Sequence, residues 1–180
     1  MRNIMISLYS ITIWRSCVFS FKRSFFALIS VITILFSSSS IAQKAPGFTL
    51  DGDRGKVALS SYKNKVVYVD FWASWCKPCR KSFTFMNEMQ NRYGKKGLKI
   101  IAINLDSERS AAKEFLKSHP ANFTIAYDKD GKTPGLYKLK VMPTSYLIDR
   151  RGNLVNIHKG FKENQTDKLE KLIAQTLSKK

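Results

Sequence analysis

The sequence predicts an α/β fold, in which helices flank a mixed central β-sheet within one domain. Two nearly continuous apolar runs, 66–71 and 98–104, are typical of strands buried in the middle of a sheet. Between and after these runs, apolar residues recur at helical spacing, which predicts amphipathic helices on both faces of the sheet. A hydrophobic content of 44% over 180 residues suits one packed domain and excludes a largely disordered chain.

Residues 1–42 differ from the rest in composition, with four basic residues and no acidic one. A basic pair precedes the apolar run 25–36, and the small residues Ser40 and Ala42 follow it, which predicts a secretory signal peptide cleaved after Ala42. The alternative is an uncleaved membrane anchor. Residues 25–36 reach only about 18 Å as a helix, but an extension to Ala42 could span the roughly 30 Å of hydrocarbon. Cys17 would be lost with a cleaved leader.

The remaining chain, 43–180, is strongly basic. Residues 1–42 hold four of the 31 Lys and Arg residues and none of the 13 Asp and Glu residues, so residues 43–180 keep a net charge of +14. The positive charges are scattered and form no stripe interleaved with aromatic residues, which argues against a nucleic-acid-binding protein. A solvated basic surface is the plain interpretation, and attraction to anionic membrane surfaces or acidic partners is the alternative.

The first predicted elements lie between residues 43 and 104. The turn-rich segment 43–65 encloses two short apolar stretches and predicts an N-terminal β-hairpin. The buried strand 66–71 follows. From Cys79 to Tyr93 apolar residues recur at four-residue spacing, which predicts a helix that ends at the following glycine and leads to the strand 98–104.

Beyond residue 104, helical and extended patterns alternate. A helical face stops at His119-Pro120, and the last helix has Asn164 or Thr166 as its expected cap. The short turn 149–152 joins two strands in an antiparallel hairpin. In chain order, we expect a helix whose apolar face spans 111–116, a strand at 123–127, a helix at 134–139, strands at 145–148 and 154–158, and a terminal helix whose apolar face spans 169–177.

The segment 71–79, Phe-Trp-Ala-Ser-Trp-Cys-Lys-Pro-Cys, holds both cysteines found after residue 17. A structural disulfide usually joins distant residues, because its stabilising effect grows with the loop that it closes. Cys76 and Cys79 enclose only two residues, so the pair predicts redox chemistry. A zinc site would need further ligands, and covalent haem attachment would need a histidine where Arg80 stands.

Cys76 stands where the strand gives way to the helix. Unpaired N–H groups and the positive end of the helix dipole favour a thiolate there, and Lys77 adds a nearby positive charge. Pro78 suits a first helical turn, because its missing N–H needs no partner. Cys79, one turn along, could resolve the mixed disulfide that Cys76 forms when it attacks a substrate disulfide.

The segment 69–79, Val-Asp-Phe-Trp-Ala-Ser-Trp-Cys-Lys-Pro-Cys, resembles the active-site segment of thioredoxins. Residues 43–180 are similar to the exported thioredoxin-like family that includes TlpA and ResA. They share the N-terminal hairpin, a helix–strand insertion at about 108–128, and the motif 142–149, Met-Pro-Thr-Ser-Tyr-Leu-Ile-Asp. The resemblance implies a thioredoxin-like fold and thiol–disulfide oxidoreductase activity, with no organic cofactor or metal.

The resemblance also implies a substrate site. Met142 and Pro143 would form a cis peptide that faces Cys76, with the backbone of Met142 binding substrate as a short added strand; an ordinary trans proline at the start of a strand is the alternative. Trp75 is expected on the apolar rim that receives the substrate. Trp72 is expected in the core, and no role is assigned to the two histidines.

Asp70 lies inside an apolar strand, where burial of a carboxylate is costly, so we expect its pKa to be raised. Thioredoxins keep an acid at the matching position, which implies that Asp70 is the general base for Cys79. Many TlpA-like proteins have a neutral residue there, and a tolerated buried polar group is the alternative. Ser82 and Thr84 stand where such proteins commonly have glutamate and proline, which weakens an assignment to cytochrome c maturation.

These observations predict a periplasmic thiol–disulfide oxidoreductase that reduces protein disulfides. Its partners would be disulfide-bearing proteins and, as the resemblance implies, a membrane-embedded thiol-transfer protein that supplies electrons. Two alternatives stay open. The same pair could oxidise or isomerise exported proteins, or the groove around Pro143 could belong to a redox-inactive chaperone or adaptor module.

Overall fold

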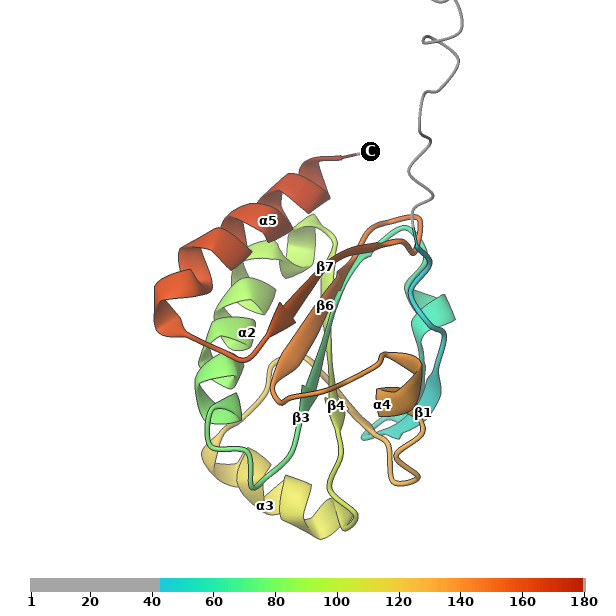
Figure 1. The fold of residues 1–180 in the computed structure, drawn as a ribbon, viewed down its shortest axis with the longest axis vertical. Helices are drawn as coiled ribbons and strands as arrows, with labels where there is room; N and C mark the ends of the chain where they lie inside the picture. The colour runs from blue at the N-terminus through green and yellow to red at the C-terminus, as the bar shows by residue number, and fades with distance from the viewer. Residues whose placement is uncertain (1–42, 180) are drawn as a thin grey trace, which may run out of the picture. The chain divides into compact units, whose positions relative to one another are not determined.

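Seven strands form one mixed β-sheet in the computed structural model, which describes residues 43–179 (Figure 1). The strands are β1 (Thr49–Gly52), β2 (Gly55–Ala58), β3 (Val66–Trp72), β4 (Leu98–Asn104), β5 (Thr124–Tyr127), β6 (Thr144–Ile148) and β7 (Leu154–Lys159). Their order across the sheet is β2-β1-β5-β4-β3-β6-β7. β3 runs parallel to β4 and antiparallel to β6, and β4 runs parallel to β5, so the predicted mixed sheet is confirmed.

Helices cover both faces of the sheet, but unequally (Figure 1). Three helices pack on one face, and a short helix and a 3-10 turn pack on the other. The first group comprises α2 (Cys79–Tyr93), α3 (Arg109–Ser118) and α5 (Thr166–Ser178); the second comprises α4 (Thr133–Leu136) and the turn Leu59–Tyr62. Two further 3-10 turns, Gly94–Lys96 and Glu163–Gln165, lie at the end of α2 and the start of α5.

The strand β3 is the centre of the packing, because all seven of its residues are buried. Successive side chains of a strand point to opposite faces, so β3 contributes to both hydrophobic clusters. Tyr68 and Trp72 belong to the cluster beneath α2, α3 and α5, whereas Val69 and Phe71 belong to the cluster on the opposite face. Both clusters and all seven strands of this sheet lie within residues 43–179, so the segment forms a compact unit with its own core.

The predicted order of elements is confirmed, and the predicted cap of the last helix is wrong. Gln165 occupies the N-cap position of α5 without a side-chain hydrogen bond to the helix. The hydroxyl of Thr166, the first helical residue, donates instead to the carbonyl of Glu163. The 3-10 turn that contains Asn164 runs directly into the helix. A backbone turn therefore precedes α5 in place of a capping side chain.

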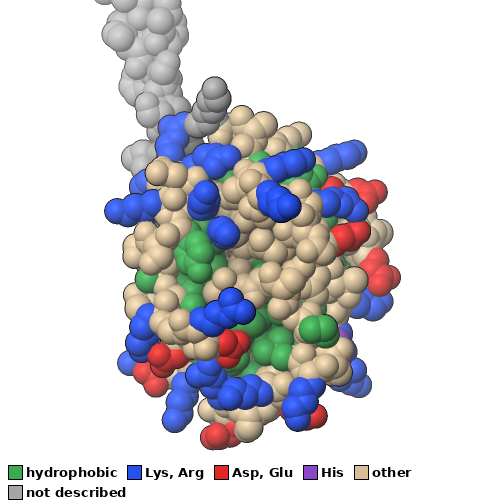
Figure 2. Space-filling model, turned by 180° about the vertical axis from the view of Figure 1, so that it is seen from behind, with side chains coloured by type: hydrophobic (Ala, Val, Ile, Leu, Met, Phe, Trp, Pro, Cys, Tyr) green, Lys and Arg blue, Asp and Glu red, His purple; other side chains and the backbone are tan. Residues whose placement is uncertain are grey.

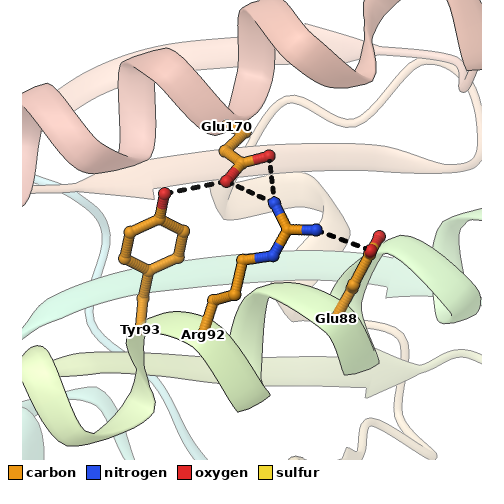
Figure 3. Close-up of polar contacts among 4 residues, drawn as sticks. All are labelled: Glu88, Arg92, Tyr93 and Glu170. Atoms are coloured by element: carbon orange, nitrogen blue, oxygen red, sulfur yellow. Dashed lines mark hydrogen bonds and ion pairs between the residues drawn. The ribbon is translucent and has the colours of Figure 1, made fainter.

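A polar contact joins the end of α2 to α5 (Figure 3). The Arg92 Nη1 donates to both carboxylate oxygens of Glu170, at 2.7 and 2.8 Å, and the Tyr93 hydroxyl donates to the Glu170 Oε1 at 2.8 Å. The Arg92 Nη2 also donates to Glu88 on its own helix. The hydrogen bond from Arg92, followed by the one from Tyr93, holds the pKa of Glu170 below its usual value.

The predicted signal peptide, with Cys17 inside it, lies outside the described residues. Within residues 43–179, no helix combines the length and the apolar character needed to cross a membrane.

Candidate active site

The two cysteines lie at the junction between β3 and α2. They are joined by a disulfide, with their Cα atoms 5.4 Å apart. The backbone N–H of Cys79 donates to the carbonyl of Cys76 at 3.1 Å, so Cys76 lies in the turn that enters the helix. Pro78 occupies the N-cap position of α2, one residue before the first helical turn in which it was expected. Cys76 therefore lies at the positive end of α2, where a thiolate is favoured.

A groove of about 470 Å³ borders the disulfide on one side. It is lined by the active-site loop 75–78, by the loop 139–142 and by Leu105. Cys76 is among the lining residues, whereas Cys79 is completely buried. The two sulfurs are therefore in different surroundings: that of Cys76 borders the groove, and that of Cys79 lies in the core.

The lining of the groove contains two of the three residues predicted for the substrate site, Trp75 and Met142, whereas Pro143 is buried next to it. Trp75 is 68% exposed, and it lines the groove together with Val141 and Met142. The peptide bond between Met142 and Pro143 is cis, as predicted. The structure thus brings Trp75, Cys76 and Met142 together, while Trp72 is fully buried, as expected.

Asp70 is only 1% exposed. Its neighbours on β3, Tyr68 and Trp72, pack in the cluster that contains Cys79, and the alternation of side chains places Asp70 on that same face. The Asp70 Oδ2 has no hydrogen-bond partner among the described residues. Burial without compensation raises the pKa of Asp70 well above its ordinary value, as the sequence predicted.

Two polar residues that sequence reasoning did not connect to Asp70 lie in its row across the sheet. Ser145 on β6 pairs with Asp70, and His158 on β7 pairs with Ser145. Residues paired in this way on antiparallel strands share a face. Ser145 Oγ accepts a 2.6 Å hydrogen bond from Tyr68, and burial lowers the pKa of His158. The buried carboxyl group is therefore the first member of a polar row.

Asp106 is a further site residue that sequence reasoning missed. It follows β4 and is 8% exposed. Its Oδ2 accepts hydrogen bonds from the Ser74 backbone N–H at 3.0 Å and from the Asn104 Nδ2 at 2.7 Å, and its Oδ1 accepts one from the Ser74 hydroxyl at 2.9 Å. Asp106 therefore fixes the loop two residues before Cys76.

Ser82 and Thr84, the two departures from the family pattern, occupy different environments on α2. Ser82 is buried and its hydroxyl donates to the carbonyl of Cys79 at 2.9 Å. Thr84 is exposed within a continuous helix. Ser82 thus places a neutral hydroxyl group near Cys79, at the position where the family pattern has an acid. Asp70 is the buried carboxyl group on this face of β3.

A redox cysteine pair at the start of a helix, beside a groove whose lining includes the residue before a cis-proline, is typical of thioredoxin-like oxidoreductases, and the fold and the site place the chain in that class. The family model for redoxins matches residues 41–173. The chain belongs to the redoxin family.

Curated relatives and solved structures agree with this assignment. The thiol-disulfide oxidoreductase ResA of Bacillus cereus is 40% identical over 116 residues, which cover 64% of this chain and 67% of the relative. ResA of Bacillus subtilis is 34% identical over 124 residues, which cover 68% and 69%. A Chlorobium tepidum structure, provisionally described as the thiol:disulfide interchange protein DsbE, matches with a TM-score of 0.75 at 49% identity and covers 76% of this chain and 97% of its own. The protein is a thiol–disulfide oxidoreductase.

Proposed function

We propose that the protein is a periplasmic reductase of protein disulfides in which Cys76 is the nucleophile and Cys79 the resolving thiol. The observation that carries this proposal is the difference in access between the two sulfurs: Cys76 lines the groove and Cys79 is buried behind it. A protein substrate can therefore reach Cys76 but not Cys79. Export follows from the predicted signal peptide, residues 1–42.

The reaction begins with the reduced pair. The Cys76 thiolate attacks one sulfur of the substrate disulfide, a mixed disulfide forms, and the other substrate sulfur leaves as a thiolate. The Cys79 thiol then loses its proton and attacks the Cys76 sulfur. This step releases the second substrate thiol and leaves the Cys76–Cys79 disulfide that the structure contains. A membrane-embedded thiol-transfer protein would return the two electrons.

Asp70 is proposed as the group that accepts the Cys79 proton. Its pKa is raised by burial, so the carboxyl group exchanges protons closer to neutral pH than an exposed aspartate does. It shares a face of the sheet with the cluster that contains Cys79. Lys77, beside Cys76 in the loop, is proposed to favour the thiolate of the nucleophile through its charge.

The groove is proposed to receive an extended segment of the substrate. Trp75, Val141 and Met142 give its lining apolar surface next to Cys76. The backbone of Met142, next to Pro143, would add the segment as a short strand. The lining is mainly apolar and also includes Lys77 and Lys140, so it suits extended substrate segments of varied sequence that are not strongly basic.

The test uses residues 43–180 and the reduction of insulin by dithiothreitol. We expect the wild-type domain to accelerate this reduction at least tenfold, and Cys76→Ser to fall to the uncatalysed rate. Reduced Cys79→Ser, mixed with insulin in the absence of dithiothreitol, should accumulate mixed disulfides, which dithiothreitol then releases. Equal activity of wild type and Cys76→Ser would overturn the proposal. Capture of substrates by Cys79→Ser only without a covalent bond would favour the chaperone alternative.

The direction of electron flow needs its own measurement, because oxidation of substrates uses the same atoms in reverse. Equilibration of the Cys76–Cys79 pair with glutathione gives its reduction potential. A value near that of thioredoxin, about −270 mV, supports the reductase, and a value near about −120 mV identifies a donor of disulfides.

A further inference from the structure

A second functional surface lies at the end of the sheet opposite the active site. β3 begins at this end and α2 finishes there, whereas the cysteine pair follows the other end of β3 (Figure 1). Figure 2 shows Lys and Arg side chains over much of the molecule, but at its upper end few acidic side chains lie among them. We define the basic pole as Lys44, Lys63, Lys65, Lys95, Lys96, Arg150, Arg151 and Lys179.

The members of the basic pole are contiguous. Lys63 and Lys65 line one hollow together with Arg150 and Arg151, and the two arginines line a second hollow with Lys179. Lys44 Nζ donates to the carbonyl of Arg151 at 2.7 Å. The Arg150 guanidinium also lies against Gly97, directly after the Lys95-Lys96 pair in the chain. Three turns and both termini of the described chain thus contribute to one surface.

Most of the charge of the basic pole is not neutralised within residues 43–179. Seven ion pairs are present in this part of the chain, and none of them includes a residue of the pole. The acidic side chain that lines the two hollows is Asp149. It accepts hydrogen bonds from the backbone N–H of Arg151 and from Asn153 and interacts electrostatically with Arg151, so it offsets one of the eight positive charges of the pole. The pole therefore presents several cations to an outside partner.

We propose that the basic pole binds the anionic phospholipid headgroups of a bilayer. The described chain begins at this pole, where Gln43 accepts a hydrogen bond from the Leu154 backbone and Lys44 pairs with Asn153. Only the residues 37–42 separate Gln43 from the apolar run 25–36, and they span at most about 21 Å. Whenever that run lies in a bilayer, during export or as a retained anchor, the pole is within reach of the headgroups.

Binding in this way would leave the redox site free. The seven residues of β3 separate the pole from the active-site loop by about 23 Å along the strand. Lipid binding and disulfide exchange therefore use different residues. The inference rests on the proposed export of the chain, but its test does not depend on redox activity.

The test is sedimentation of residues 43–180, without the apolar leader, with phosphatidylcholine vesicles that contain or lack phosphatidylglycerol. We expect binding only to the anionic vesicles, and we expect added salt to weaken it. Each basic residue near an anionic surface strengthens binding about fivefold. The variant Lys63→Gln, Lys65→Gln, Lys95→Gln and Arg151→Gln should therefore lose at least about a hundredfold in affinity.

The matched control removes the same charge from exposed lysines outside the pole, with Lys113→Gln, Lys129→Gln, Lys159→Gln and Lys162→Gln. This variant should keep at least a tenth of the wild-type affinity, and both variants should keep insulin reductase activity, which shows that they are folded. An equal loss of binding in the two variants would overturn the proposal, since net charge alone would explain it. Equal binding to neutral vesicles, or tighter binding to a DNA duplex than to anionic vesicles, would also overturn it.

Discussion

The carboxylate of Asp106 accepts hydrogen bonds from both the backbone N–H and the hydroxyl of Ser74, although 32 positions separate the two residues in the sequence. β3 and β4 are parallel neighbours, so the residues that follow them meet at the same edge of the sheet. The loop that holds Cys76 is thereby tied to the end of the adjacent strand.

Asp106→Ala should loosen this loop. Loss of the acceptor leaves the Ser74 N–H and the Asn104 amide without their partner, which costs about 1–3 kcal/mol of the free energy of unfolding. Insulin reduction should slow several-fold, because Cys76 is then less precisely placed. Asp106→Asn keeps one oxygen acceptor, so its free energy of unfolding and its rate of insulin reduction should lie between those of wild type and those of Asp106→Ala. Urea unfolding and the insulin assay measure the two effects, and unchanged values in both would contradict the role.

Asp70→Asn should stabilise the protein at neutral pH while slowing its exchange reaction. Because burial raises the pKa of Asp70 above 3.8, the unfolded chain releases this proton at lower pH than the folded chain does. Wild-type stability therefore falls as pH rises from about 4 to the raised pKa, and a neutral asparagine avoids this loss. Thermal unfolding at several pH values should show the variant melting higher at pH 7, with the difference disappearing near pH 4. An exchange rate at neutral pH equal to that of wild type would remove Asp70 as general base.

Trp75→Ala and Trp72→Ala should separate substrate binding from stability. Trp75 is 68% exposed on the groove wall, so its removal should change the free energy of unfolding by less than about 0.5 kcal/mol and raise KM for protein disulfides several-fold. Trp72 is fully buried against Phe83 and Phe115, and its removal should cost about 3–5 kcal/mol. Denaturant unfolding and steady-state kinetics on both variants test the pair. A KM for Trp75→Ala equal to that of wild type would contradict its place in the substrate site.

Glu170→Gln should show the opposite pH dependence from Asp70→Asn. The pKa of Glu170 is lowered by Arg92 and Tyr93, so the contact between α2 and α5 stabilises the fold above the usual pKa of 4.5 and is lost as pH falls through the lowered value. The contact is largely in solvent, so the variant should melt at most about 2 °C lower at pH 7. Thermal unfolding from pH 7 to pH 3 should show the melting temperatures of wild type and Glu170→Gln converging. A difference in melting temperature that persists at pH 3 would contradict this explanation.

The elements predicted best are those that local pattern alone determines. The helix from Cys79 to Tyr93 has the predicted bounds, and the strands β3 and β4 coincide with the two apolar runs. These segments are long, and their apolar residues follow one regular pattern from end to end, so the pattern predicts which residues are buried. The cysteine pair was found for the same reason, since its spacing is local.

The residues missed are those whose partners depend on the register of the sheet. Continuing the register of the pair Ile148–Leu154 would pair Ser145 with residue 157, but an irregularity at Leu147 and Ile148 moves the partner to His158. A shift by one residue moves a side chain to the other face, so the row from Asp70 to His158 is hidden from sequence reasoning. The link between Ser74 and Asp106 is hidden for a similar reason, because it joins two loops.

The strand β3 supports both ends of the molecule. It starts beside the cationic surface, finishes at the loop of the reactive sulfur, and has no exposed residue between them. A strand that is packed into both halves of the core unfolds in a single cooperative transition. The proposed membrane-binding surface and the redox site therefore depend on the same cooperative unit. Gradual denaturation should therefore abolish the two properties at a common midpoint, however independent their surfaces are in the native state.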